Sequence, residues 1–589
     1  MNLDSRLSAL EARGLIRSVG QPGEGEFLFR HTLFQETAYR SLLRGERTEL
    51  HRSVAGILEK LHVDDEDSVA PILAYHFKQA GDEQRALRYF TLAAKAAAKV
   101  YANQEAIEHY QQAIDLALRV APEPDRLVEL YTGCGRLHEL MGDFDGAIRV
   151  YDVMQAKSRA LNLPILEVKA RVARDTLYSS PSAVNDTRKA MQSGQATLAM
   201  ARELGDEEAE AHSLWNLMLA GFFSGQGKVS REYGEQALTL AQRIGDRQLE
   251  AFIMNDLARS NLFSDGLQAR GFELAESAVQ LWKELDNIPM LTDGLSGLAM
   301  FASYSGDYRK AVELSEQALA MSEEIDHPWG KAYSQYVMSM AYMEMGDYMQ
   351  TMRTGDEALR WSEVAGFVVP QVAIRALQAW VLKDLGRPDE AEEIARVATE
   401  CAKTSLPMWT AMGLAMEVLL DLSRSEPPGS GRFGELLDLL SDPERQVFPV
   451  AEIYGRFAEA SYFLATGEYQ SVLDTTERIT SLQTRLDSTS FKVDSLMVRG
   501  RAARSLGMVE DGWSALEGAR DLAEKTGAGR TLWRVLHLMR QWAAEDGRPE
   551  AAELKALARK ALGPVVEPLK DEWRGTFLAT PDAAEVWSA

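Results

Sequence analysis

The sequence predicts an all-α, right-handed superhelical solenoid built from two-helix repeats. Segments long enough for about four turns of helix alternate with turn signals of Gly and Asp. Such a repeat cannot bury its apolar face alone and must stack on its neighbours. The turns recur every 40 or 41 residues in two interleaved sets, the first at Gly205, Gly245, Asp286, Asp326 and Gly366 and the second at Gly225, Gly266, Gly306, Gly346 and Gly386. Small residues keep the same register at Ala237, Ala278, Ala318, Ala358 and Ala398.

Composition narrows the function classes. The 589 residues carry a net charge of −24, with 46% hydrophobic and 26% charged residues. An excess of acidic residues argues against direct binding of nucleic acid or an anionic membrane surface, because both select clustered Lys and Arg. The N-terminus lacks the basic start and the apolar run of a signal peptide. The sequence also contains no stretch of 18 apolar residues that could span a bilayer. With two cysteines, Cys134 and Cys401, we expect a cytoplasmic protein.

Residues 1–62 differ from the rest of the chain. A leucine-lined first helix is followed by an apolar strand at 15–19, a Gln-Pro-Gly-Glu-Gly turn at 21–25 and a second strand at 27–29. Two further helices come next, separated near Arg44-Gly45. This order of a helix, a hairpin and two helices predicts a small winged-helix-like module over 1–62.

The repeats fill most of the remaining chain. An acidic connector at 64–67 leads into an array over 63–424. A Pro-Pro-Gly stretch then predicts a loop or joint at 425–432, because Pro cannot continue a helix. A second set of repeats is predicted over 433–563. The tail, 564–589, is predicted to be irregular and to cover the last repeat with its aromatic residues.

A Gly-acid-aromatic turn recurs at repeat spacing, at Gly142, Gly306, Gly346 and Gly467. We expect the Gly to end one helix in the left-handed conformation, the acid to cap the next helix, and the ring to pack inward. Around Gly142, the small residues Gly135 and Ala147 and the aromatic Tyr151 complete a pattern that resembles the tetratricopeptide repeat. The array therefore resembles a tetratricopeptide-like solenoid.

The first 120 residues carry a second resemblance. The run Phe27-Leu28-Phe29-Arg30-His31, with Ala38-Tyr39, Leu42-Leu43 and Leu50-His51, is similar to the winged-helix end of AAA-type or STAND-type ATPase modules in large bacterial signalling proteins. In that family the winged helix precedes tetratricopeptide-like repeats, and some members carry class III adenylate cyclase or LuxR-type DNA-binding domains. The resemblance implies an upstream nucleotide-binding domain as a partner and makes His31 a candidate nucleotide-sensing residue. A capping or core role is the competing interpretation of His31.

No motif in the sequence predicts catalysis, a metal or a cofactor. The nine histidines are scattered, and no pair has the spacing of a metal site on a helix. The run 429–434 matches G-x-G-x-x-G by letters, but no strand precedes it, so it lacks the context of a phosphate-binding turn. We therefore expect a protein that is not an enzyme and needs no cofactor.

The remaining candidate is a binding groove on the concave side, which the first helix of each repeat lines in tetratricopeptide arrays. Tyr, Met and Trp are common on adaptable binding surfaces, although packing between repeats is an equal alternative. Aligning the turns predicts the groove residues Asp293, Ser296, Met300, Tyr333, Tyr336, Met340, Met343, Trp380 and Lys383.

The predicted function is a non-enzymatic interaction and sensor module of a signal-transduction ATPase or regulator, binding a protein or peptide in this groove. Two alternatives stay open. The chain could be part of an ATP-dependent adenylate cyclase or transcriptional regulator whose catalytic domains lie upstream, or a free-standing repeat scaffold.

Overall fold

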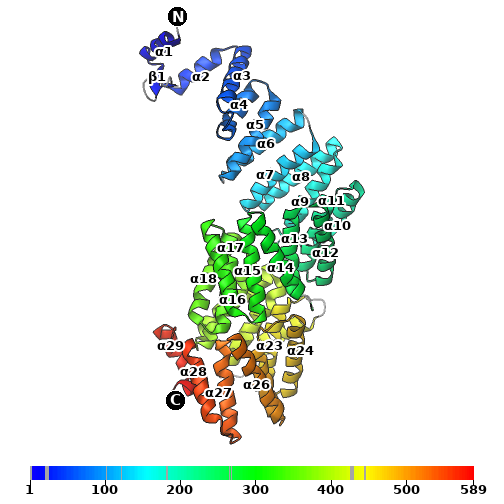
Figure 1. Cartoon of the computed structure of the whole chain (residues 1–589), viewed down its shortest axis with the longest axis vertical. Helices are drawn as coiled ribbons and strands as arrows, with labels where there is room; N and C mark the ends of the chain where they lie inside the picture. The colour runs from blue at the N-terminus through cyan, green and yellow to red at the C-terminus, as the bar shows by residue number, and fades with distance from the viewer. Residues whose placement is uncertain are drawn as a thin grey trace. The chain divides into compact units, whose positions relative to one another are not determined.

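The structure is a computed structural model and describes residues 3–19, 26–100, 102–120, 122–180, 184–263, 266, 268–424, 430–442 and 446–588. These residues form thirty α-helices, one short 3₁₀ helix and one two-stranded sheet, and the fold is a tetratricopeptide-like superhelical solenoid (Figure 1). The chain divides into two compact units, Met1–Arg174 and Asp175–Ala589, which are described separately.

Unit 1 opens with the mixed module. Strands β1 and β2 pair antiparallel, with Ile16 opposite Phe29 and Val19 opposite Glu26. The turn predicted at 21–25 lies outside the described residues. The order of a helix, two strands and two helices is as expected, while the winged-helix assignment stays a prediction. The elements are α1 (Leu3–Ala12), β1 (Ile16–Val19), β2 (Glu26–Phe29), α2 (Thr32–Ser41) and α3 (Arg44–Leu61).

The repeats of unit 1 come next, and from α4 to α8 each helix packs on its successor in sequence, while α9 continues into unit 2 at Asp175. Small residues such as Ala86, Ala94 and Ala106 are fully buried where these helices cross. The helices are α4 (Glu66–Gln79), α5 (Glu83–Lys99), α6 (Asn103–Val120), α7 (Pro124–Leu140), α8 (Phe144–Leu161) and α9 (Pro164–Ser179).

Unit 2 continues the same plan over many more repeats. Its first half contains α10 (Thr187–Leu204), α11 (Glu207–Phe223), α12 (Gly227–Ile244), α13 (Arg247–Leu262), α14 (Gln268–Glu284), α15 (Ile288–Ser305), α16 (Tyr308–Glu324), α17 (Pro328–Met345), α18 (Tyr348–Ala365), α19 (Val368–Asp384) and α20 (Pro388–Ser405). Its second half contains η1 (Pro407–Trp409), α21 (Thr410–Ser423), α22 (Ser430–Ser441), α23 (Pro449–Thr466), α24 (Tyr469–Arg485), α25 (Lys492–Ser505), α26 (Val509–Thr526), α27 (Gly529–Glu545), α28 (Ala551–Val566), α29 (Asp571–Leu578) and α30 (Pro581–Trp587).

The hairpin corners form largely as the sequence predicts. Gly346 ends α17 with a φ of +84°, and the Asp347 carboxylate accepts a hydrogen bond from the Gln350 amide. Gly467 also takes the left-handed conformation, but Glu468 forms no side-chain cap, so that part of the prediction is wrong. The longer Glu side chain is not among the preferred N-cap residues, whereas Asp is.

Two further expectations need correction. The stretch predicted as a loop at 425–432 is helical from Ser430 onward, while 425–429 lie outside the described residues. The tail predicted to be irregular from Pro564 is helical: α28 runs through Pro564 to Val566, and α29 and α30 come after it. Phe577 in α29 is fully buried and meets the ring of Trp533 edge to face.

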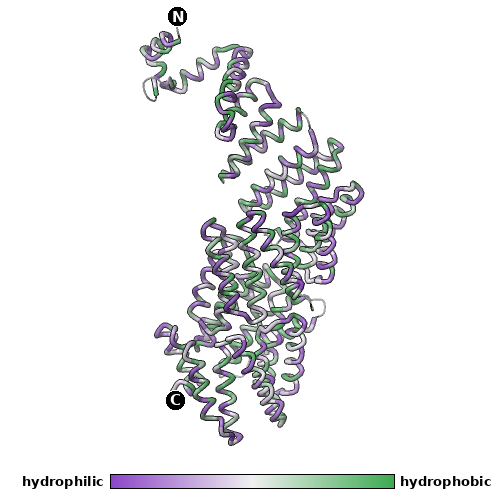
Figure 2. The backbone as a smooth tube through the Cα atoms, in the orientation of Figure 1, coloured by the Kyte–Doolittle hydropathy of each residue, from purple (hydrophilic) through white to green (hydrophobic). Residues whose placement is uncertain are grey.

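The second set of corners in unit 2 packs against segments about 185 to 220 residues later in the chain. The Gly266 amide donates to the Arg485 carbonyl at 2.9 Å, 219 residues away, and the Thr489 amide donates to the Tyr304 carbonyl at 2.8 Å, 185 residues away. Successive turns of the superhelix therefore touch, and the array of unit 2 is closely wound. Most of its buried apolar side chains form one large cluster, with a small second one at Ala460, Val472 and Ala502. Apolar and polar residues alternate along the helices (Figure 2).

The first set of corners is different. No atom lies within 4 Å of a methyl group placed on Gly205, Gly245 or Gly366, whereas one on Gly346 would lie 2.9 Å from the Arg530 backbone nitrogen. The two interleaved sets of turns in the sequence therefore correspond to an open edge and a packed edge of the array.

Candidate functional site

The nine predicted groove residues lie on α15, α17 and α19, the inner helices of unit 2. Seven of them are buried, and only Met340 and Lys383 are half-buried. The sequence-based prediction placed them on an open concave face, but the close winding brings α23, α25 and α27 against that face. Trp380, for example, contacts the rings of Phe457 and Phe491. Direct contact between these buried side chains and a protein partner would require the superhelix to open.

Asp293 is a buried carboxylate that is hydrogen-bonded to the neighbouring repeats. Its carboxylate accepts hydrogen bonds from Asn255 at 2.7 Å, Arg259 at 3.1 Å and the Trp329 indole at 2.9 Å. These donors come from the preceding and following inner helices, α13 and α17. The buried charge is therefore paired, and it joins three successive repeats.

Tyr336 and Met340 border a small cavity of about 30 Å³ together with Tyr304 and Tyr454. Burial raises the pKa of each of these three tyrosines well above its usual value, so the phenols stay protonated and act as neutral polar groups. The space is enough for about one or two waters and is too small for a bulky peptide side chain.

A buried ion cluster joins the middle of unit 2 to its end. The Arg530 guanidinium on α27, with a side chain only 2% exposed, donates to both oxygens of Asp494 on α25, at 3.0 and 2.6 Å. The same group lies 3.2 Å from Glu344 on α17. Two acids thus flank one arginine, and residues 186 positions apart are linked.

A second ion cluster lies on the neighbouring turn of α27. Asp384 accepts hydrogen bonds from Lys383 at 2.9 Å and Tyr348 at 2.8 Å, and it pairs with Arg534 at 3.0 Å. Burial alone would raise the pKa of Asp384, but the charges of Arg534 and Lys383 outweigh it and hold that pKa well below its usual range. The carboxylate is therefore ionised at neutral pH.

Both ion clusters border a partly open cavity of about 270 Å³, lined by five successive inner helices, α19, α21, α23, α25 and α27, with α30 at its side. Two predicted groove residues, Trp380 and Lys383, line it. The other residues that line the cavity could not be identified from the sequence, because the residues they contact lie far away in the chain. The remaining lining residues are Asp384, Leu419, Phe457, Ser461, Asp494, Met497, Val498, Arg501, Arg530, Arg534, His537 and Asp582.

Unit 1 presents an exposed apolar stripe on α3. Leu50, Val54, Ile57 and Leu61 recur at helical spacing and are exposed, while His51 and Ala55 on another side of α3 are buried. More exposed apolar residues lie nearby in sequence, at Leu33, Phe34, Leu43, Val63, Ile72 and Tyr75. We call Leu50, Val54, Ile57 and Leu61 the α3 stripe.

The histidines of unit 1 fall into two environments. His31 is exposed at the N-terminus of α2 and makes no side-chain cap, so it takes neither of the capping and core roles. His51 and His76 meet with their Nδ1 atoms 2.8 Å apart, and the Tyr39 hydroxyl lies 3.0 Å from His51 Nε2. Burial lowers the pKa of both, so the pair is neutral and shares one proton in a hydrogen bond.

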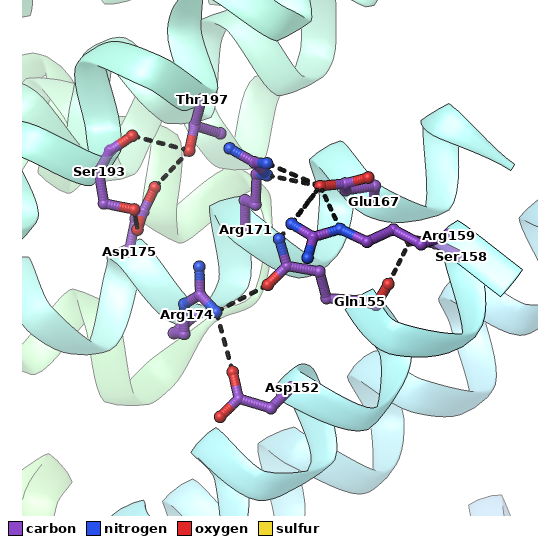
Figure 3. Close-up of polar contacts among 10 residues, drawn as sticks. All are labelled: Asp152, Gln155, Ser158, Arg159, Glu167, Arg171, Arg174, Asp175, Ser193 and Thr197. Carbon is purple, nitrogen blue, oxygen red and sulfur yellow. Dashed lines mark hydrogen bonds and ion pairs between the residues drawn. The ribbon is translucent and has the colours of Figure 1, made fainter. Parts of the chain in front are cut away.

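A charged cluster stabilises the last repeat of unit 1. The Glu167 carboxylate accepts hydrogen bonds from Arg159 at 2.9 Å and Arg171 at 2.7 Å (Figure 3). Burial alone would raise the pKa of Glu167, but these hydrogen bonds lower it to about 2. In unit 2, the buried Asp175 accepts hydrogen bonds from Ser193 and Thr197, each at 2.6 Å.

The described residues contain no group of three or more His, Cys, Asp or Glu side chains arranged to hold a metal ion. Within the same residues, no helix combines the length and apolar character that crossing a membrane requires. Gly431 and Gly434 of the glycine-rich run lie inside helix α22 and not in a turn after a strand.

No family model matches the sequence. A stretch of 103 residues, 18% of this chain, is 32% identical to an uncharacterized protein of Rhizobium meliloti and covers 10% of that relative. The match thus spans about a tenth of the length of the curated relative.

Solved structures similar to this chain have helical repeats. Cut9–Hcn1 is 14% identical, with 90% of this chain and 93% of that one covered and a TM-score of 0.47. A Rap protein complexed with competence and sporulation factor is 15% identical, with 68% and 98% covered and a TM-score of 0.43. A signal transduction ATPase with a tetratricopeptide repeat sensor, from Pyrococcus horikoshii, is 16% identical, with 62% and 60% covered and a TM-score of 0.35.

By its fold the chain is a helical repeat scaffold, an architecture that typically serves protein interaction and not catalysis.

Proposed function

We propose that this chain is a non-enzymatic interaction and sensor module of a signal-transduction ATPase or regulator. In this proposal, α2 to α4 of unit 1 dock on a nucleotide-binding domain, and unit 2 is the sensor. The observation that carries the proposal is the α3 stripe, a row of large apolar side chains left in water. Fully burying a side chain of this kind is worth about 1.5–3 kcal/mol, and the four are 38–73% exposed, so covering them together can help to anchor a protein domain.

The acidity of the chain favours a protein over a membrane as the occupant of this surface. With a net charge of −24, the chain is repelled by anionic lipid headgroups. The resemblance of residues 27–55 to the winged-helix end of ATPase modules supports a nucleotide-binding domain as the partner. His31, exposed next to the hairpin, is the residue of this region that would reach the nucleotide.

Photo-crosslinking in cells tests the docking surface. A photoreactive phenylalanine analogue replaces Leu61, whose side chain is 73% exposed on the α3 stripe, and in a control replaces Val364, which is 65% exposed in unit 2. We expect the Leu61 probe alone to form a crosslink to a protein with an ATP-binding domain. Adding Leu50→Lys should abolish that crosslink.

Three outcomes would overturn the proposal. If the Leu61 probe crosslinks only to a second copy of the chain, the free-standing scaffold is the better interpretation. If it forms no crosslink at all, or the Val364 probe captures the same protein equally well, the α3 stripe is not a docking surface.

A further inference from the structure

The cavity of about 270 Å³ among the inner helices of unit 2 has the features of a ligand site. We propose that it binds a small organic anion, a carboxylate carried on an apolar or aromatic body. The volume is far above the ~15 Å³ that one water needs, and it suits a molecule of amino-acid size. This proposal goes beyond the docking function of unit 1 and does not depend on it.

Two of the three acidic groups that line the cavity already have partners, while the third, Asp582, is exposed and lies 3.9 Å from His537. Arg530 donates to both oxygens of Asp494, and Asp384 accepts from Lys383, Tyr348 and Arg534. These carboxylates therefore have little capacity left to attract a cation or a donor-rich ligand.

Apart from Asp582, the groups with spare capacity are donors. The Trp380 indole N–H is buried and has no hydrogen-bond partner among the described residues. Lys383 Nζ donates to Asp384 and keeps two further N–H groups. Arg501 lines the cavity and makes no ion pair with any described residue.

His537 adds another polar atom without a partner. Its Nε2 lies 3.0 Å from the side-chain amide of Gln541, 3.4 Å from a carboxylate oxygen of Glu585 and 3.9 Å from one of Asp582. Its Nδ1 is buried without a partner in the part of the chain that the structure describes. In the tautomer that carries the proton on Nδ1, this atom can donate to a bound carboxylate.

The cavity is much less acidic than the chain around it. Its lining contains four cationic side chains, those of Lys383, Arg501, Arg530 and Arg534, against the three carboxylates of Asp384, Asp494 and Asp582. Glu344, which pairs with Arg530 from outside the lining, brings the numbers to four and four. The protein as a whole carries a net charge of −24, so a place without an acidic excess is where the chain can accept an anion.

The rest of the lining selects the body of the ligand. Trp380 and Phe457 provide aromatic surface, and Leu419, Met497 and Val498 provide aliphatic surface. An inorganic oxyanion would leave these walls in contact with water, whereas an aryl or branched alkyl group would cover them.

Calorimetric titration of the full chain with phenylacetate tests the proposal, with neutral phenylacetamide and cationic phenethylamine as matched probes. We expect phenylacetate to bind in the cavity and raise the unfolding temperature. The amide should bind at least about tenfold more weakly, because hydrogen bonds to a charged acceptor are the stronger ones, and the amine should not bind.

Arg501→Gln is the decisive variant, because Arg501 is exposed and its replacement leaves the packing intact. We expect it to weaken phenylacetate binding by roughly tenfold with an unchanged unfolding temperature of the free protein. Arg478→Gln, an exposed arginine on α24 away from the cavity lining, is the matched control and should bind as the parent does. Lys383→Gln should also weaken binding.

The proposal is overturned if phenylacetate gives neither heat nor stabilisation, or if the amide binds as tightly as the acid. It is also overturned if Arg478→Gln weakens binding as much as Arg501→Gln. These results leave the crosslinking experiment on the α3 stripe unaffected, so the two proposals fail separately.

Discussion

The two units leave very different surfaces open to solvent. Unit 2 winds closely enough to cover its own inner helices, and it buries Trp380, Tyr336 and the ion pairs of Arg530. Unit 1 leaves large apolar side chains such as Leu43 and Leu61 more than 70% exposed. Close winding of the repeats therefore covers the inner face of unit 2, whereas the α3 stripe of unit 1 lies in the module before its repeats and is left exposed.

The largest expected loss of stability comes from breaking the buried ion cluster of unit 2, compared with breaking an exposed ion pair. Arg530→Met would leave Asp494 and Glu344 without their shared cation, and we expect it to destabilise unit 2 by about 3–5 kcal/mol in thermal or urea unfolding. Arg520→Met removes a half-exposed pair with Glu524 and should cost less than about 1 kcal/mol. Equal losses in the two variants would mean that the buried cluster does not hold the superhelical turns together.

The next effect compares the packed and open edges of unit 2. Gly346 and Gly366 both have positive φ values, of +84° and +67°, so Ala is strained at both. Only at Gly346 would the new methyl also press on the Arg530 backbone, at 2.9 Å. We expect Gly346→Ala to cost about 2–4 kcal/mol and Gly366→Ala about 1 kcal/mol in unfolding experiments. A larger loss for Gly366→Ala would contradict the contact between successive turns.

The smallest effect belongs to unit 1 and depends on pH. The pKa of Glu167 is about 2 in the folded state and ~4.3 when unfolded, so its ionised form stabilises the fold above about pH 4.3. That stabilisation, of about 2 kcal/mol, should disappear as the pH falls from about 4.3 toward 2. Glu167→Gln should reduce stability at pH 7 but show a smaller loss over the acid range. A parallel pH profile for parent and variant in amide-exchange measurements of α8 and α9 would contradict this assignment.

The repeat itself could be predicted from sequence because its signals are local. Gly346 and Asp347 determine a corner through their own φ value and capping bond, and neither needs a distant partner. The prediction that Glu468 caps α24 was wrong for an equally local reason, the length of the Glu side chain.

The candidate site could not be predicted in the same way. Trp380 and Lys383 were expected on an open groove, yet whether they face solvent depends on how many repeats make one superhelical turn. That number is the sum of many small rotations between repeats, none of which has a sequence signature. Arg530 and Asp494 escaped notice because the pairing of Arg530 with Glu344, 186 residues earlier, exists only in the wound array.

The open corners have a practical consequence for engineering. Gly205 and Gly245 lie at helix ends where nothing crowds them, so a short epitope, a fluorophore or a flexible insertion placed there would leave the stacking undisturbed. The same insertion at Gly306, where the side chains of Thr489 and Thr526 approach closely, would separate layers of the coil. The open edge of the array can therefore carry reporters, while insertions at the packed edge would separate successive turns of the superhelix.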